Sequence, residues 1–106
     1  MVEIQLSFTP EMEAAILSRR KTCTTRLEQK GEAGDTFRLK DGRVCFISCV
    51  ANFKFWQIVS ILYGAEGFDE PGDFTDFWNN LPGYPNHEEC WGRTFPVHFF
   101  TLREER

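Results

Sequence analysis

A predicted β-hairpin around Asp41-Gly42 restricts the possible folds of this chain more than any other element. Apolar and polar residues alternate on both sides of this dipeptide, over about residues 35–40 and 43–53. Asp-Gly suits a two-residue turn because glycine readily adopts the positive φ that a type I′ turn requires. The cross-strand pairs predicted for that turn are Leu39 with Val44 and Phe37 with Phe46. We therefore expect an antiparallel pair of strands with one continuous apolar face.

Other segments predict strands and helices on either side of this hairpin. Thr9 followed by Pro10 is typical of a helix start, because the hydroxyl caps the first turn and proline fits its first position. The predicted elements are a strand over Ile4–Phe8, helices over about 10–20 and 55–63, a third helix capped by Asp73, a loop over 82–92 and a last strand over 95–101. The third helix has one apolar face, formed by Phe74, Phe77, Trp78 and Leu81. The simplest interpretation of that face is contact with the core.

Length and composition decide which architecture these elements can build. The chain has 106 residues, of which 42% are hydrophobic and 26% are charged, the balance of an ordinary globular protein. A chain of this size usually forms one domain, and its mostly antiparallel strands must cover their edges. We predict an α+β fold with a single domain over residues 1–106. Its architecture should be a small curled β-barrel with two to three helices packed on it.

Charge is distributed unevenly along the chain. Twelve Lys and Arg residues against sixteen Asp and Glu residues give a formal net charge of −4. Between residues 19 and 54, nine basic residues outnumber four acidic ones, whereas residues 55–92 contain seven acids and no Lys or Arg. The net charge disfavours a protein that coats long polyanions. The basic first half still allows a local cleft that binds one nucleotide.

The sequence predicts neither secretion nor a membrane span nor a metal centre. The N-terminus lacks a basic segment followed by an apolar run, and no run approaches the ~18 apolar residues of a membrane helix. Four cysteines without a C-x-x-C pair are typical of reduced thiols, and His87-x-x-Cys90 is the only close pair of metal-ligand type. We expect a cytoplasmic protein with no cofactor and no metal.

The segment from Arg19 to Arg26 has the most unusual composition in the chain. Its eight residues include four cations and three threonines. One interpretation is a basic helix end, stabilised by the helix dipole, followed by an extended β-branched stretch. The other interpretation is a functional site, and it depends on the pattern of the surrounding segments.

The order of several short motifs resembles that of the ASCH domains, which have a PUA-like fold. The resemblance covers about residues 3–102. Its motifs are the helix end Ile16–Arg26, Gly34-Asp35 at the start of a strand, Glu66-Gly67-Phe68 after the second helix, a Phe/Trp helix beyond it, and Phe95-Pro96-Val97 in the closing strand. The family commonly has a left-handed glycine two residues before the lysine of the first motif, where this chain has Arg19.

Within that family, the sequence is most similar to small bacterial amidohydrolases that remove the acetyl group from N(4)-acetylcytidine. Those enzymes use a Lys, a Thr three residues later and a Glu after the second helix, which correspond to Lys21, Thr24 and Glu66. The resemblance implies that Lys21 accepts the proton of Thr24, which attacks the acyl carbon, and that Glu66 protonates the leaving amine. The residues expected to contact the substrate, a modified nucleoside or a single nucleotide of RNA, are Arg20, Arg26, Tyr63 and Phe68.

The residues themselves leave alternatives open. Lys21 and Glu66 can form a simple ion pair, which opposes the proton transfers that catalysis needs. On a regular strand Lys21 and Thr24 point to opposite faces because their separation is odd, so the chain has to turn between them. Cys23 is a rival nucleophile, although a buried thiol is its simpler interpretation. The alternative functions are a non-catalytic RNA or modified-base binding module and a ribonuclease.

Overall fold

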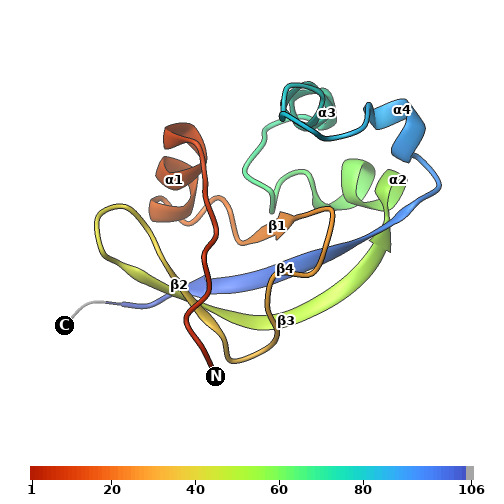
Figure 1. Cartoon of the computed structure of the whole chain (residues 1–106). Coiled ribbons are helices and arrows are strands. Elements are labelled where there is room, and N and C mark those ends of the chain that lie inside the picture. Colours follow the sequence, from red (N-terminus) through yellow and green to blue (C-terminus); the bar gives the residue numbers. More distant parts are fainter. Residues whose placement is uncertain (105–106) are drawn as a thin grey trace.

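Within residues 1–104, which the computed structural model describes, four antiparallel strands form a strongly curved sheet (Figure 1). The last two residues of the predicted domain lie outside this range. The strands are β1 (Cys23–Thr25), β2 (Thr36–Arg38), β3 (Val44–Lys54) and β4 (Thr94–Leu102), in the sheet order β1-β4-β3-β2. The predicted α+β fold, a small curled barrel with packed helices, is confirmed.

Short helices lie on one side of the curved sheet in Figure 1, with α1 over one end and the others over the opposite end. The helices are α1 (Pro10–Leu17), α2 (Phe55–Gln57) continued by the π-helical turn η1 (Ile58–Leu62), α3 (Pro71–Asn79) and α4 (His87–Cys90). The Thr9 hydroxyl caps α1 by accepting the Met12 N–H at 3.2 Å, as the sequence predicts. Helix α3 begins after Glu70, so Asp73 lies in its first turn and not at its cap. Helix α4 lies inside the predicted loop over 82–92.

The hairpin between β2 and β3 differs from the prediction by one residue in register. Phe37 lies opposite Cys45 instead of Phe46, and Leu39 is shifted in the same way. The loop has three residues and ends at Gly42, which has a φ of 93°; this is the geometry of a type I turn followed by a left-handed residue. Phe37 and Cys45 are therefore buried together, and Phe46 is 38% exposed.

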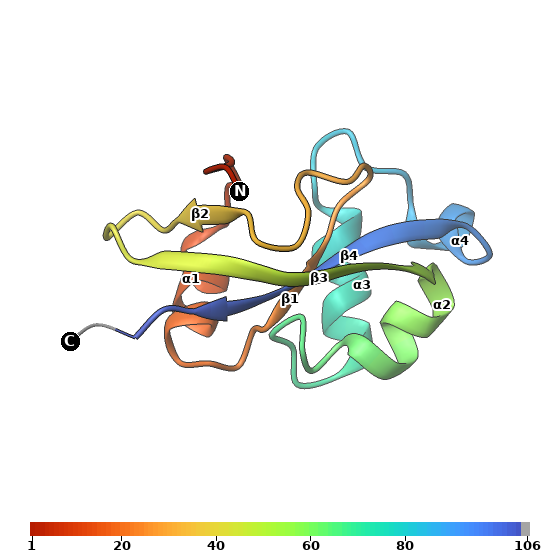
Figure 2. The same cartoon turned by 90° about the horizontal axis from the view of Figure 1, so that it is seen from below.

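The N-terminal segment is extended but is not a strand, contrary to the prediction for Ile4–Phe8. A single parallel bridge joins Glu3 to Thr36. The apolar side chains of the segment still point inward, and the Phe8 and Phe37 rings lie with their centroids 5.7 Å apart. The segment runs past β2 to the start of α1 (Figure 2), which brings Phe8 close to the residues that follow α1.

Two hydrophobic clusters use opposite faces of β4. Phe95 and Val97 belong to a cluster with α2, η1 and α3, whereas Phe100 and Leu102 belong to a cluster with α1 and β2. Successive side chains on a strand point to opposite faces, so β4 is buried on both. The short strand β1 pairs with β4 at one edge of the sheet. It lies between α1 and α3 in Figure 1.

Arg19 ends α1 in a left-handed conformation, with a φ of 65°. The Arg20 N–H donates to the Ala15 carbonyl and the Arg19 N–H to the Ile16 carbonyl, each at 2.9 Å. These two bonds form the pair of a Schellman motif. The helix therefore ends in the way that a glycine at this position favours, although the sequence has arginine there. Its last residue is Leu17, so the predicted end near residue 20 was too late.

We expect Arg19→Gly to stabilise the protein by about 0.5–1 kcal/mol, because glycine adopts this conformation without the steric cost that arginine bears. Chemical denaturation measures the change. Arg19→Ala is the matched control, since it also removes the exposed contact with Glu104 at 3.9 Å but keeps the Cβ, and it should not stabilise. Equal effects of the two substitutions would contradict strain at Arg19.

Candidate active site

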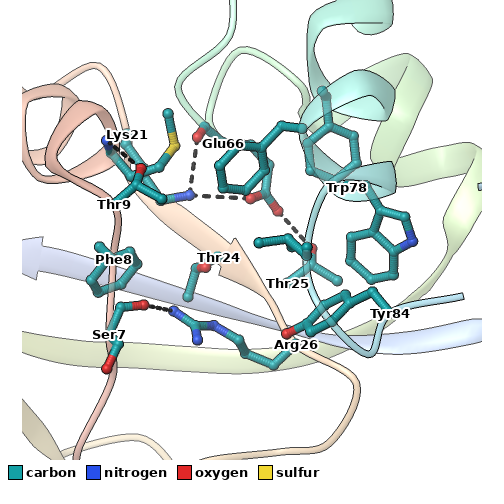
Figure 3. A pocket seen from close by; sticks show the side chains of 14 residues that line it. Ser7, Phe8, Thr9, Lys21, Thr24, Thr25, Arg26, Glu66, Trp78 and Tyr84 are labelled. Atoms are coloured by element: carbon teal, nitrogen blue, oxygen red, sulfur yellow. Dashed lines mark hydrogen bonds and ion pairs between the residues drawn. The ribbon is translucent and has the colours of Figure 1, made fainter.

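A pocket with about 460 Å³ of atom-free space, open solvent included, lies between the N-terminal segment, β1 and α3 (Figure 3). Of the residues that the sequence predicts as catalytic or substrate-binding, Lys21, Thr24, Arg26 and Glu66 line it. The fold thus brings together residues that are up to 45 positions apart along the chain.

Lys21 reaches the pocket from the end of α1, with its ammonium group fully hydrogen-bonded. Its Nζ donates to the Cys23 carbonyl at 2.9 Å, to the Glu66 carbonyl at 3.0 Å and to Glu66 Oε1 at 3.2 Å. The Lys21 and Glu66 side chains are each 3% exposed, so the ion pair is buried. Lys21 precedes β1, and its side chain extends along that strand to the Cys23 carbonyl. Lys21 and Thr24 therefore both line the pocket, although their separation is odd.

The turn that carries Glu66 lies along the outer edge of β1. The backbone N–H groups of residues 22 and 23 both donate to the Ala65 carbonyl, at 2.7 and 3.2 Å. Gly67 follows with a φ of 104°, and a Cβ there would lie 3.2 Å from the Lys21 Cβ. Glycine after Glu66 thus lets the turn lie directly against Lys21, which brings the two charges together.

Thr25 contacts the second carboxylate oxygen of Glu66. Its Oγ1 donates to Glu66 Oε2 at 2.6 Å, whereas Lys21 donates to Oε1. The sequence interpretation missed Thr25, although the alternation of side chains along an extended stretch indicates its position. Thr25 lies four residues after Lys21, so alternation places these two on one face and Thr24 on the other. Each oxygen of Glu66 therefore has its own partner, one cationic and one neutral.

The Thr24 hydroxyl is open to the pocket. Every buried side-chain nitrogen and oxygen within residues 1–104 has a hydrogen-bond partner, yet no bond involves the Thr24 hydroxyl among the described residues. The hydroxyl must therefore be accessible, although the residue as a whole is only 5% exposed. Because β1 is an edge strand, Thr24 and Thr25 both line the pocket even though they leave the strand on opposite faces.

His98 holds the backbone of Thr24 in place. Its Nε2 accepts the Lys30 N–H at 2.9 Å, and its Nδ1 lies 3.2 Å from the Thr24 carbonyl. Because Nε2 is an acceptor, Nδ1 carries the proton and donates to Thr24. Burial lowers the pKa of His98, which favours this neutral form. The ring thereby links β1 to the segment after it from the side opposite Glu66.

Aromatic rings from three parts of the chain form the walls of the pocket. Helix α3 contributes Phe74, Phe77 and Trp78, the N-terminal segment contributes Phe8, and the predicted loop contributes Tyr84. The Trp78 and Tyr84 rings meet edge to face with centroids 4.8 Å apart. The apolar face of α3 thus contacts the core, as predicted, and also lines the pocket. Flat ring faces of this kind suit the binding of a planar ligand.

Arg26 lies among these rings. Its guanidinium is 5.0 Å from the centroid of the Phe8 ring, and its Nη2 donates to the Ser7 carbonyl at 2.9 Å. Burial lowers the pKa of Arg26, against the opposing effects of Tyr84 and Glu66. Arginine stays charged in proteins and carries five N–H donors, so Arg26 has donors left for a ligand.

Arg20, Tyr63 and Phe68 lie outside this pocket. Arg20 is at the surface, where its Nη2 donates to the Gly67 carbonyl at 2.9 Å. Tyr63 packs against the hydrophobic cluster of α2, η1 and α3. Phe68 contacts the Phe74 ring edge to face, with centroids 5.6 Å apart, so it supports the wall of the pocket from behind.

Cys23, the rival nucleophile, is fully buried in the same hydrophobic cluster. Burial, together with the nearby Glu66 carboxylate, raises the pKa of the Cys23 thiol far above its ordinary value. The attacking form of cysteine is the thiolate, which this environment disfavours at Cys23.

Residues 1–104 contain no group of three or more His, Cys, Asp or Glu side chains that could hold a metal ion. In the same part of the chain, no helix is long and apolar enough to cross a membrane. All four cysteines are free thiols, and Cys49 is the exposed one.

No protein-family model and no curated protein matches the sequence. An ASCH domain from Lactobacillus crispatus is 13% identical and superposes with a TM-score of 0.63, over 95% of this chain and 79% of that one. A protein from Pyrococcus furiosus is 14% identical, with a TM-score of 0.63 over 98% of this chain and 96% of that one. The ASCH protein of Zymomonas mobilis is 16% identical, with a TM-score of 0.59 over 98% of this chain and 68% of that one. This protein therefore has the fold of the ASCH domains, the PUA-like family that its sequence resembles.

Proposed function

We propose that this protein is an amidohydrolase that removes the acyl group from N(4)-acetylcytidine or a related nucleoside. The observation that carries the proposal is the meeting of Lys21, Thr24 and Glu66 in one aromatic-walled pocket. A hydroxyl open to a ligand lies there beside a buried ion pair of 3.2 Å. Nucleophile, base and acid are the three groups that amide hydrolysis needs.

The rest of the pocket suits a pyrimidine base. Phe8, Trp78 and Tyr84 offer ring faces and edges against which a planar base can pack. Arg26 offers N–H donors, and the carbonyl oxygen and ring nitrogen of cytosine are acceptors that a guanidinium can bind. The aromatic walls carry little positive charge for a chain of phosphates, which favours a nucleoside or a single nucleotide over a long strand.

The buried pair can supply both the base and the acid for acylation. A proton moved from Lys21 to Glu66 converts the ion pair into a neutral amine, which can act as a base, and a carboxylic acid, which can donate a proton. The amine takes the hydroxyl proton of Thr24 while Thr24 Oγ1 bonds to the acyl carbon. The bond from that carbon to the N4 atom breaks as N4 receives the proton of Glu66. The products of this step are cytidine and an acyl ester on Thr24.

Hydrolysis of the acyl ester by water completes the cycle. In this step Glu66 acts as the base and Lys21 as the acid. The Glu66 carboxylate takes one proton from water, whose oxygen bonds to the acyl carbon. The ester bond to Thr24 breaks, and Thr24 regains its proton from the Lys21 ammonium. Acetic acid leaves, and the amine and carboxylic acid of the enzyme return to their starting forms. The free, mostly buried thiols of the chain support a cytoplasmic location for this reaction.

A binding module is the second candidate, and the saturation of Lys21 favours it. All three hydrogens of the Lys21 ammonium already have acceptors, which stabilises the charged form and opposes its use as a base. In that case the pocket holds a modified base of RNA without converting it, with Arg26 and the rings as the binding groups. The remaining alternative, a ribonuclease, would instead cleave the RNA and shorten it.

Incubation of the protein with N(4)-acetylcytidine, followed by chromatography of the nucleosides, tests the proposal. We expect catalytic release of cytidine and acetate. A protein that binds an acetylcytidine-containing RNA oligonucleotide without releasing acetate would be a binding module, and one that shortens the oligonucleotide would be a nuclease. Either of these results, without cytidine release, overturns the amidohydrolase proposal.

A further inference from the structure

Thr25 has a contact that the proposed reaction does not yet use. Its hydroxyl donates to Glu66 Oε2 at 2.6 Å, within the 2.5–2.7 Å typical of a hydroxyl bound to a charged oxygen. Such bonds are about twice as strong as those between neutral groups. Both residues are buried, at 6% and 3% exposure, and both line the pocket.

Two hydrogen bonds fix the orientation of the Glu66 carboxyl group, whereas a single one would leave the group free to rotate. The terminal torsion of a glutamate side chain is broad, so the bond from Lys21 to Oε1 alone does not fix the plane of the carboxyl group. Thr25, which lies on the neighbouring strand β1, donates a hydrogen bond to the other oxygen, Oε2. That strand also carries Thr24, so one strand bears the nucleophile and also contacts the acid.

We propose that Thr25 is a positioning residue, which orients the Glu66 carboxyl group toward the leaving nitrogen of the substrate. This inference rests on the proposed amidohydrolase function. Bond formation by Thr24 Oγ1 does not depend on the Glu66 proton, whereas expulsion of the cytosine amine does. Thr25 therefore acts on the step in which the carbon–nitrogen bond breaks. General acid catalysis contributes about 10²–10⁴-fold to such steps, and a misplaced acid loses part of that contribution.

The test compares two substrates that differ in their leaving group. N(4)-acetylcytidine releases a basic amine that needs a proton, while p-nitrophenyl acetate releases a phenolate that leaves without one. We expect Thr25→Val, which keeps the shape and removes the hydroxyl, to lower kcat for N(4)-acetylcytidine by about 10²-fold. KM should stay nearly unchanged. The first-turnover release of p-nitrophenolate from p-nitrophenyl acetate should also stay unchanged, because it reports acylation of Thr24 before water attacks the ester. Thr25→Ser, which restores the hydroxyl, should recover most of the lost activity.

Thr22→Val is the matched control, because Thr22 is an exposed threonine of the same segment. It should leave both reactions unchanged. A Thr25→Val protein that loses both reactions equally, or that keeps full activity on N(4)-acetylcytidine, overturns the positioning role. A wild-type protein that hydrolyses neither substrate overturns the proposed function itself, so the two failures are distinguishable. Thermal unfolding of each variant establishes that it is folded.

Discussion

Lys21→Met should lower the free energy of unfolding by about 3–5 kcal/mol, because it leaves the Glu66 carboxylate buried without its cation. Lys21 and Glu66 are each 3% exposed and lie 3.2 Å apart, so water is a poor substitute for the lost partner. A domain of this size has about 5–15 kcal/mol of stability in total. The substitution should therefore remove a large share of it, as measured by denaturant titration.

The double variant Lys21→Met with Glu66→Leu identifies the cause of that loss. Replacing both charges by apolar groups of similar volume removes the buried charge and restores packing, so the double variant should be more stable than Lys21→Met alone. Lys30→Met controls for the change in net charge, because its exposed side chain should cost less than about 0.5 kcal/mol. If the losses of unfolding free energy in Lys21→Met and Glu66→Leu simply add in the double variant, the ion pair contributes nothing to stability. The proximity of Lys21 and Glu66 in the pocket would then need another explanation.

The sequence is sufficient to predict most elements of this fold, because their signals are local. The Thr9-Pro10 start of α1 and the apolar face of α3 follow from spacing and capping chemistry alone. The hairpin was predicted in the right place but with the wrong register. Asp41-Gly42 fits both a two-residue and a three-residue loop, since both place Gly42 in a left-handed conformation. The core decides between them, by burying Cys45 instead of Phe46 opposite Phe37.

Helix ends and edges were harder to predict, because they depend on contacts that are distant in sequence. Arginine is rarely left-handed, so the residue type at Arg19 does not itself indicate that α1 ends there in a Schellman motif. Only the resemblance to a family with glycine at this position does. The strand predicted for residues 4–8 has the right alternation, but it meets β2 at a single bridge. Extended segments with one apolar face look alike in sequence, whether or not they pair.

The candidate site was predicted in part, and its missing members come from tertiary structure. Lys21, Thr24 and Glu66 came from the resemblance to a family, and their meeting in one pocket needed the turn at Gly67. Thr25 was overlooked because only Thr24 matches the motif. Tyr84 lies in a segment without a clear periodic pattern, so its place in the pocket wall follows only from how that segment folds back onto α3.

Thr24→Val should reduce the hydrolysis of N(4)-acetylcytidine by more than about 10³-fold, the scale on which loss of a nucleophile slows acyl transfer. Valine has the shape of threonine, and the Thr24 hydroxyl has no hydrogen-bond partner among the described residues. The substitution should therefore leave the free energy of unfolding nearly unchanged. A large loss of activity without loss of stability is the expected signature of a nucleophile.

Two further measurements separate Thr24 from its neighbours. An acyl-enzyme intermediate should be trapped by acid quenching and detected as a mass increase on the peptide that contains Thr24, in the wild type but not in Thr24→Val. Thr22→Val, an exposed threonine two residues earlier, should retain both turnover and the intermediate. The contrary result is turnover that survives in Thr24→Val and disappears in Thr25→Val, for both ester and amide substrates. That result would identify Thr25, and not Thr24, as the nucleophile. In that event the 2.6 Å bond to Glu66 would be the contact between nucleophile and base.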